Sequence, residues 1–208
     1  MRGTSRKQRE KEQHRREVLE AAEAVFAEKG FYNAAMQEIA HRAEFAVGSL
    51  YNIFDSKAAI YRELLQMRAR QYRDEVVRDM ERCTDPCEKI RAVIRAKLRF
   101  FEENQRFFQI FTRATSGEQP GPVLTLSHKG RELYRTYVET VSTVFEEGIK
   151  AKVFVNVNPK LLTLAVECVT NAAIAHALHT GGEKLADTTP EVIERILFEG
   201  ILRERANR

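Results

Sequence analysis

The chain has 208 residues and a formal net charge of +4, with 43% hydrophobic and 31% charged residues. This composition is that of a soluble globular protein, and the length excludes a small scaffold that depends on disulfide staples. The three cysteines cannot all pair, the first residues lack the apolar core of a signal peptide, and no run of about 20 apolar residues is present to span a membrane. We therefore expect a cytoplasmic protein with reduced thiols.

The amino-terminal end is strongly basic. Residues 1–17 contain three glutamates and a larger set of cations, namely Arg2, Arg6, Lys7, Arg9, Lys11, Arg15 and Arg16. Such a cluster is typical of proteins that bind phosphate groups by releasing counterions. We interpret residues 1–12 as a flexible basic arm, and such an arm can be a solvated tail in the free protein and become ordered along DNA.

Residues 13–57 are predicted to form a domain of three helices. The first helix carries apolar residues at helical spacing and ends at Lys29-Gly30. A short second helix follows from Met36 to Arg42, and after a break a third helix covers residues 46–52. Two short helices joined by such a turn form a helix-turn-helix motif, whose second helix enters a DNA major groove.

The third helix is predicted to present a smooth outer face. Phe45, Leu50 and Phe54 are its inward anchors, and its outward residues are small or neutral, namely Ala46, Val47, Gly48, Ser49 and Asn52. Bulky or acidic groups at these positions would hold a helix away from base edges. The pattern therefore favours a helix that reads DNA.

The stretch from Arg16 to Leu65 carries several further elements in a defined order and spacing, namely Ala21-Ala22, Phe26, Glu28-Lys29-Gly30-Phe31, Ile39-Ala40, Ala43, Gly48, Leu50-Tyr51, Phe54 and Ser56-Lys57. In this order they resemble the amino-terminal domain of the TetR family of bacterial one-component regulators. The apolar spacings alone also fit any small helical bundle, but such a bundle does not explain Gly48, Tyr51 and Lys57 occurring together.

The resemblance implies that Tyr51 and Lys57 contact the DNA backbone, and it makes Ser49 and Asn52 candidates for reading base edges. The alternative for Tyr51 is a packed ring with a solvated hydroxyl. The predicted DNA-binding residues are Ala35, Gln37, Arg42, Ala46, Val47, Gly48, Ser49, Tyr51, Asn52 and Lys57.

The sequence departs from the family pattern in three places. Glu44 stands where the family usually has a glycine in a left-handed turn, and Ala34 and Ala46 stand where it usually has hydroxyl caps. An alanine cap costs about 1 kcal/mol relative to serine or threonine, and a glutamate at positive φ costs about as much again. We expect Asn33 to cap the second helix instead.

Residues 58–208 are predicted to form a larger helical domain. Ser56 is a candidate N-cap for an unbroken helix from Ala58 to Arg82. Asp85-Pro86-Cys87-Glu88 predicts the next helix start, with Asp85 as the cap and Glu88 completing a capping-box-like pair. Cys83 and Cys87 can share a helix face, but no histidine or third cysteine lies nearby, so we predict no metal site and no cofactor.

Aromatic residues concentrate around positions 100–111 and recur in the following long helix. They are candidates for an apolar ligand cavity, and the alternative is that they only fill a helical core. The family resemblance adds the expectation of a cavity for an unknown small-molecule effector. The predicted lining is Phe100, Phe101, Phe107, Phe108, Phe111, Tyr134, Tyr137, Val141 and Phe145.

The helix that starts at Asn158-Pro159 carries only Glu167 as a charged side chain up to Gly182. Such a helix has to be buried on more than one side, either in an internal core or against a partner subunit. With a last helix expected from Thr188, it is predicted to form a four-helix homodimer interface, which is also the family's arrangement. The predicted interface residues are Leu161, Ala165, Cys168, Ala172, Ala175, His176, Ile193, Ile196, Leu197 and Ile201.

The sequence thus predicts an all-α protein, with a three-helix DNA-binding domain joined by a long helix to a ligand-binding and dimerisation domain. An enzyme is disfavoured because no phosphate loop, nucleophile elbow or zinc-type cluster appears. The resemblance implies a homodimeric regulator, most often a repressor, that binds a palindromic operator and is released by a largely apolar effector. The alternative is a sequence-tolerant nucleoid or adaptor protein without an effector.

Overall fold

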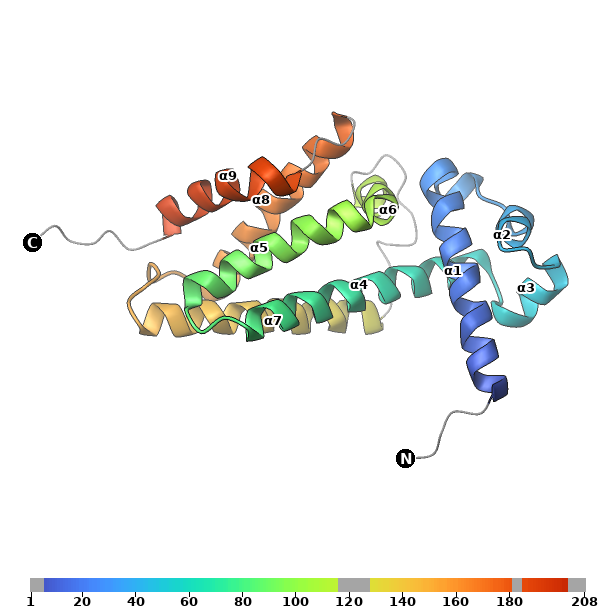
Figure 1. Ribbon diagram of the computed structural model, residues 1–208, viewed down its shortest axis with the longest axis horizontal. Helices are drawn as coiled ribbons and strands as arrows, with labels where there is room; N and C mark the ends of the chain where they lie inside the picture. Colours follow the sequence, from blue (N-terminus) through green and yellow to red (C-terminus); the bar gives the residue numbers. More distant parts are fainter. Residues whose placement is uncertain (1–5, 116–127, 181–184, 202–208) are drawn as a thin grey trace, which may run out of the picture. The chain divides into compact units, whose positions relative to one another are not determined.

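The computed structural model describes residues 6–115, 128–180 and 185–201. These residues form nine α-helices and no strand, as the all-α prediction requires (Figure 1). The chain divides into two compact units. Unit 1 comprises Met1–Arg68 and Arg106–Lys129, and unit 2 comprises Ala69–Gln105 and Gly130–Arg208. The division differs from the predicted boundary at residue 57, because the first half of the fourth helix belongs to unit 1.

Unit 1 is built from α1 (Arg6–Asn33), α2 (Met36–Arg42), α3 (Val47–Ile53), the start of α4 (Lys57–Glu81) and α6 (Gln105–Thr115). Its core contains fully buried side chains from four of these helices, namely Phe26, Ile39, Leu50 and Tyr61. The ring of Tyr61 packs edge-on against Phe26, with centroids 5.2 Å apart. Because α1 supplies one side of this core, it supports the two short helices from behind.

Helix α1 begins at Arg6, so the prediction of a flexible arm over residues 1–12 is wrong for residues 6–12. Residues 1–5 lie outside the described residues. Near its other end the helix bends at Gly30, whose φ of 76° is a left-handed conformation. A glycine adopts this conformation without steric cost, and the predicted end of the regular helix at this position is confirmed.

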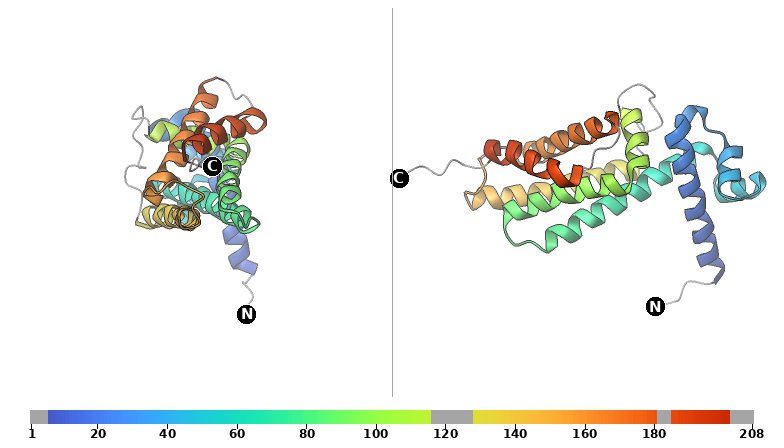
Figure 2. Two further views of the ribbon diagram at one scale, coloured as in Figure 1. Left: turned by 90° about the vertical axis from the view of Figure 1, so that its left-hand side faces the viewer. Right: turned by 45° about the horizontal axis from the view of Figure 1, so that its top comes forward.

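Unit 2 contains the second half of α4, α5 (Pro86–Glu103), α7 (His128–Lys150), α8 (Pro159–His179) and α9 (Leu185–Ile201) (Figure 2). The predicted cap at Asp85 is confirmed, since its side chain accepts a hydrogen bond from the backbone N–H of Glu88 at 3.0 Å. The predicted helix start at Asn158-Pro159 is confirmed as well, and there Asn158 accepts a hydrogen bond from the backbone N–H of Lys160 at 2.9 Å. Each cap is followed by proline at the first turn. Helix α4 runs without interruption through the point where the two units divide.

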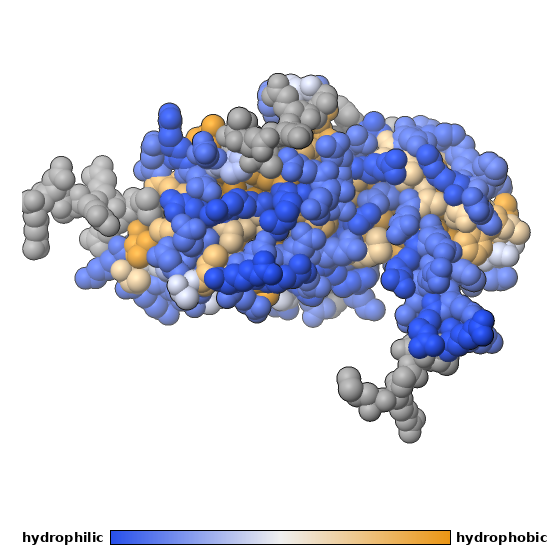
Figure 3. Space-filling model, viewed as in Figure 1, coloured by the Kyte–Doolittle hydropathy of each residue, from blue (hydrophilic) through white to orange (hydrophobic). Residues whose placement is uncertain are grey.

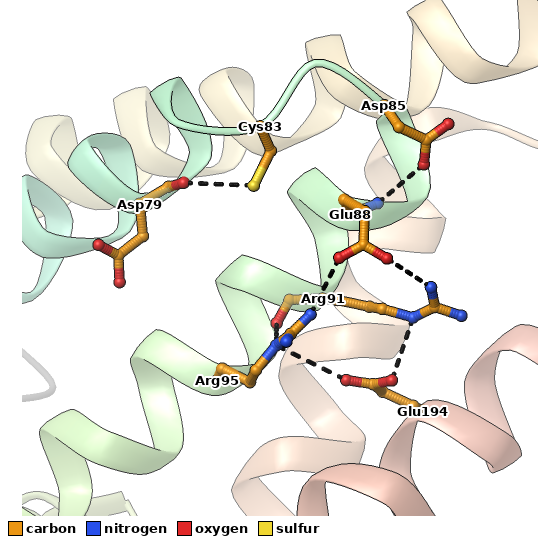
Figure 4. Close-up of polar contacts among 7 residues, drawn as sticks. All are labelled: Asp79, Cys83, Asp85, Glu88, Arg91, Arg95 and Glu194. Atoms are coloured by element: carbon orange, nitrogen blue, oxygen red, sulfur yellow. Dashed lines mark hydrogen bonds and ion pairs between the residues drawn. The ribbon is translucent and has the colours of Figure 1, made fainter.

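The side chain of Glu88 does not complete a capping box, which corrects the prediction. Its carboxylate pairs with Arg91 at 2.7 Å and with Arg95 at 3.2 Å (Figure 4). Glu194 of α9 faces the same two arginines, with its carboxylate 3.1 Å from Arg91 Nε. This ionic cluster ties α9 to the beginning of α5.

Helix α9 begins at Leu185, earlier than the predicted start at Thr188, and includes Pro190. Its apolar residues do not all face one way. Ile193, Leu197 and Phe198 are buried within the chain, whereas Val192 and Ile196 are exposed. These apolar residues therefore form an inward and an outward set, because adjacent helical residues differ by about 100° in direction.

Helix α8 is long and apolar enough to cross a membrane by length and composition alone, with a mean hydropathy of 1.6. This finding corrects the expectation that no such stretch exists. The core helix of a soluble protein passes the same test when it is mostly buried, but only 33% of this stretch is buried within the single chain. Much of its apolar surface is therefore exposed.

Candidate nucleic-acid interface

The turn between α2 and α3 is held by backbone hydrogen bonds. Ala43 donates to Ile39, and Phe45 donates to the carbonyl of Ala40, both at 2.9 Å. Glu44 lies between them with φ of 59°, which confirms that this position takes the left-handed conformation despite the absence of glycine. A side chain in this region costs about 1–2 kcal/mol relative to the right-handed conformation.

Replacing Glu44 by glycine should therefore stabilise the protein. We expect a net gain of about 0.5–1 kcal/mol in the free energy of unfolding, since glycine removes the steric cost but adds entropy to the unfolded chain. Urea denaturation should show a higher midpoint at unchanged slope. The matched control is Ala43→Gly, at φ −85°, which should lose stability. If both variants lose stability equally, the turn at Glu44 carries no strain.

The two motif helices lack side-chain caps. Ala35 and Ala46 are the N-cap residues of α2 and α3, and neither can accept a hydrogen bond through its side chain. The missing hydroxyl before α2 thus corresponds to Ala35 and not to Ala34. The prediction for Asn33 is wrong as well, since its amide donates to the carbonyl of Lys29 at 3.2 Å and remains with α1.

Glu38 replaces part of the missing cap on α2. Its carboxylate accepts a hydrogen bond from the backbone N–H of Ala35 at 3.0 Å and also pairs with Lys29 of α1. These contacts hold the pKa of Glu38 below its usual value, the ion pair with Lys29 being the larger cause. Helix α2 is therefore held to α1 by a contact that sequence reasoning missed.

Helix α3 presents most of its predicted face to solvent. Ala46, Gly48, Ser49 and Asn52 are exposed, as is Tyr51 at 49% of its surface, whereas Val47 is half-buried. Leu50 and Phe54 are buried and anchor the helix from the other side. A Cβ atom added at Gly48 would meet nothing within 4 Å, so no neighbour in the fold requires glycine there.

Two predicted DNA-binding cations already have partners within the protein. Lys57 donates to the backbone carbonyls of Ala34 at 2.6 Å and Tyr32 at 3.1 Å, and its ammonium lies 4.7 Å from the ring centre of Phe31. Burial lowers the pKa of Lys57. A lysine has three N–H donors, so one is left for a phosphate oxygen. Lys57 thus also joins the start of α4 to the end of α1 and to the residue that follows it.

Arg42 forms an ion pair with Glu28 of α1 at 2.7 Å. This hydrogen bond raises the pKa of Arg42 and lowers that of Glu28. Gln37 is exposed and Ala35 is half-buried. For all ten residues of the predicted set, contact with DNA stays a prediction.

Arg15 belongs to the fold and not to a free basic surface. Its guanidinium donates to the carbonyl of Ile53 at 2.9 Å, pairs with Glu63 of α4 and lies 4.2 Å from the ring centre of Phe54. It therefore fixes the end of α3 against α1 and α4. The remaining described cations at the start of α1 are exposed, namely Arg6, Lys7, Arg9, Lys11 and Arg16. The surface at this end of the helix is strongly hydrophilic in Figure 3.

An open depression of about 500 Å³ lies on unit 1 beside the turn of the motif. Its charged lining comes from Arg42 and from the carboxylates of Glu17, Glu20 and Glu44. Carboxylates repel phosphate groups, so this depression is unsuited to DNA. It contains none of the residues predicted to line a ligand cavity.

The predicted cavity residues are distributed over both units. Phe107, Phe108 and Phe111 belong to α6 in unit 1. The other six belong to unit 2, where five are buried and Tyr134 is exposed at 49%. The six comprise Phe100, Phe101, Tyr134, Tyr137, Val141 and Phe145. Their role in binding a ligand stays a prediction.

The predicted dimer interface is partly exposed in the single chain. Leu161 and Ile196 are exposed at 58% and 59%, and Cys168, Ala172 and His176 are exposed as well. Ala165 and Ala175 are half-buried. Ile193 and Leu197 are buried within their own chain, which corrects their assignment to an interface, and the side chain of Ile201 lies outside the described residues.

Comparisons with known proteins agree with this architecture. The family model described as "Bacterial regulatory proteins, tetR family" matches residues 18–64, and the "Tetracyclin repressor-like, C-terminal domain" matches residues 83–175. The HTH-type transcriptional activator FasR of Mycolicibacterium smegmatis is 30% identical over 100 residues, which are 48% of this chain and 46% of that protein. The chain thus matches about half the length of this relative.

Two further proteins are similar over larger parts of the chain. The HTH-type transcriptional repressor KstR2 of Mycobacterium tuberculosis is 28% identical over 140 residues, which are 64% of this chain and 68% of that protein. The structure of the transcriptional regulator FadR from Bacillus subtilis in complex with stearoyl-CoA has the same fold. It has a TM-score of 0.76 and 20% identity, and the match covers 89% of this chain and 98% of that one. With the helix-turn-helix in α2 and α3 and both family models matched, the chain belongs to the TetR family of DNA-binding transcription regulators.

Proposed function

We propose that this protein is a cytoplasmic, ligand-responsive repressor that binds a palindromic operator as a homodimer. The observation that carries the proposal is the outer face of α3, where Gly48, Ser49, Tyr51 and Asn52 are exposed while Leu50 fixes the helix from behind. Gly48 lowers the stability of a helix by up to about 1 kcal/mol relative to alanine. Since no neighbouring atom in the fold requires a glycine there, close approach of DNA is the reason for its presence.

The outer surfaces of α8 and α9 support the dimer. Leu161 and Leu164 of α8 and Val192 and Ile196 of α9 are exposed, and α8 packs against α9. Exposed apolar residues on neighbouring helices mark an interaction surface. A second copy of the chain would cover them. The two α3 helices of the dimer would then read half-sites about 34–36 Å apart.

The effector is proposed to be a long-chain fatty acyl-CoA or a ligand of similar apolar character. The relatives support this class, since one solved structure holds stearoyl-CoA and the regulator KstR2 is described as a ketosteroid regulator. Binding in unit 2 would shift α4, which continues into unit 1, and would lower operator affinity by the difference in ligand affinity between the two states.

The proposal can be tested by selecting binding sites from a random DNA pool at one stated salt concentration. Wild-type protein should recover a palindrome, and stearoyl-CoA should weaken its binding. Ile196→Glu should sediment as a monomer and lose the palindrome, because the charge enters the apolar interface. The matched control is Thr84→Glu, an exposed residue in the turn before α5, which should behave as wild type.

Recovery of no motif by the wild-type protein would contradict the proposal and would favour sequence-tolerant binding. Tighter binding in the presence of stearoyl-CoA would contradict release of the operator by this effector. A dimeric Ile196→Glu variant would place the interface elsewhere.

A further inference from the structure

A chain of hydrogen bonds passes through unit 2 and joins four helices. Tyr137 of α7 donates its hydroxyl proton to Glu167 of α8 at 2.5 Å. The other carboxylate oxygen of Glu167 accepts from Lys97 of α5 at 2.7 Å. The hydroxyl of Tyr72 of α4 lies 2.9 Å from that of Tyr137. Because the single hydroxyl hydrogen of Tyr137 is already used in the hydrogen bond to Glu167, Tyr72 is the donor in this last bond.

Most of this chain is shielded from water. The side chains of Lys97 and Glu167 are exposed at only 4% and 12%, Tyr137 is buried, and Tyr72 is half-buried. Burial raises the pKa of Tyr72 and of Tyr137 well above the usual value near 10, so both hydroxyls keep the protons that the chain requires. The ring of Tyr72 also packs against Phe100 and Tyr137, with centroids 5.5 and 5.4 Å away.

Stability alone does not explain a buried ion pair in this position. Removing two charges from water costs several kcal/mol per ion, and well-packed apolar residues of similar volume are often as stabilising or more so. What the chain provides is a fixed arrangement, because each member satisfies the next and one broken bond leaves a buried polar group without its partner. Such a network has an intact and a broken state.

Tyr72 is the member that lies on α4, and α4 is the helix that also belongs to unit 1. We propose that the chain Tyr72–Tyr137–Glu167–Lys97 is a latch that fixes α4 to α5, α7 and α8 in the operator-binding state. In this latch Tyr72 is the positioning residue for α4. The effect on the operator rests on the proposed function, whereas the effect on α4 does not.

The latch also indicates which ligands can release it. An effector oxygen, such as a carboxylate or thioester carbonyl, can accept a hydrogen bond from Tyr72 or Lys97 and so replace the hydrogen bond that the effector breaks. A ligand without such an acceptor would leave these groups buried and unpaired, which is costly. The latch therefore favours effectors that combine an apolar body with a hydrogen-bond acceptor.

The test is Tyr72→Phe in the full-length protein, which removes one hydroxyl and keeps the ring. Without DNA or effector, we expect amide hydrogen exchange in residues 69–81 to become at least about fivefold faster than in wild type. Operator affinity without effector should fall by at least about fivefold. Tyr137→Phe, which removes the central hydroxyl, should have the same two effects.

The matched control is Ser142→Ala. The hydroxyl of Ser142 is buried and forms a 3.0 Å hydrogen bond with Thr163, so it joins α7 to α8 without a member on α4. This variant removes a comparable buried bond and should leave both the exchange of residues 69–81 and operator affinity within twofold of wild type.

Exchange in residues 69–81 that is no faster in Tyr72→Phe than in Ser142→Ala would overturn the latch. Faster exchange with operator affinity within twofold of wild type would overturn its coupling to DNA binding. If wild-type protein recovers no operator, the proposed function fails, and the exchange measurement still decides whether the chain holds α4.

Discussion

Replacing Gly48 by glutamate should abolish operator binding while leaving the fold intact. The position lies on the exposed face of α3, and a Cβ atom there would meet nothing within 4 Å. Glutamate also favours a helix more than glycine does, so the melting temperature should stay the same or rise. Bound to DNA, the side chain would place a negative charge next to base edges and phosphates. Like charges in contact cost several kcal/mol, so affinity should fall by at least about 100-fold.

A graded series separates size from charge at this position. Gly48→Ala adds only a methyl group and should weaken operator binding less than Gly48→Glu, with a small gain in stability. Thr84→Glu controls for net charge, because it adds the same charge at an exposed position of unit 2. Fluorescence anisotropy with a labelled operator gives the operator affinity, and thermal melts of the same samples give the melting temperature. An operator affinity of Gly48→Glu within threefold of wild type would show that this face of α3 does not approach DNA.

Removing the carboxylate of Glu167 should be among the most destabilising single changes in unit 2. Glu167→Ala leaves the ammonium of Lys97 buried without its ionic partner and takes away the acceptor of Tyr137. Breaking a buried pair in this way costs about 3–5 kcal/mol, which is a large part of the stability of an ordinary domain. Chemical denaturation should report this loss as a lower midpoint.

The double variant Lys97→Met/Glu167→Met is the control for this loss. It removes both charges and keeps apolar volume, so it should recover most of the stability that the single variant loses. The double variant should still lack the proposed latch, because Tyr137 has no carboxylate to bind. If the double variant is as unstable as Glu167→Ala, the loss comes from packing and not from the uncompensated charge.

The pH dependence of Glu167→Ala follows from the pKa of Lys97. Burial lowers this pKa below the usual value of 10.5, and Glu167 opposes the shift in the wild type. Without Glu167 the pKa falls further, so between the folded-state value and 10.5 the unfolded chain binds more protons than the folded one. The free energy of unfolding then rises with pH in this window. The deficit of the variant should therefore shrink as the pH is raised toward 10, and a constant deficit would contradict this account.

Features that depend on neighbours in the chain were predictable. Asp85-Pro86 and Asn158-Pro159 start helices because a cap needs only an acceptor and the N–H groups two or three residues later. The inward anchors Leu50 and Phe54 follow from the motif's own spacing, and the left-handed position of Glu44 was implied by the resemblance to the family. The helix-turn-helix and its smooth outer face could thus be identified from the amino-acid sequence alone.

Partners distant in the sequence were not predictable. Arg15 counts as a basic residue of the arm by sequence, but it is held by Glu63. Lys57 similarly bonds to the carbonyls of Tyr32, at the end of α1, and of Ala34, which follows that helix. A charge pattern shows that cations are present, whereas the tertiary structure decides which carboxylate or carbonyl comes within reach of each one.

The same reason explains the buried network. Glu167 is the lone charge in an apolar stretch of α8 and is conspicuous in the sequence, whereas Lys97 is one of several charged residues of α5, with Arg95 and Arg99 close by. Their pairing across 70 positions, and the link through Tyr137 to Tyr72, depends on how four helices are rotated and packed. Helical periodicity indicates which residues lie on the same face of a helix, but not which face of another helix packs against them. Packing alone decided that Lys97 and Glu167 became one ion pair and that α9 turned Ile193 inward and Ile196 outward.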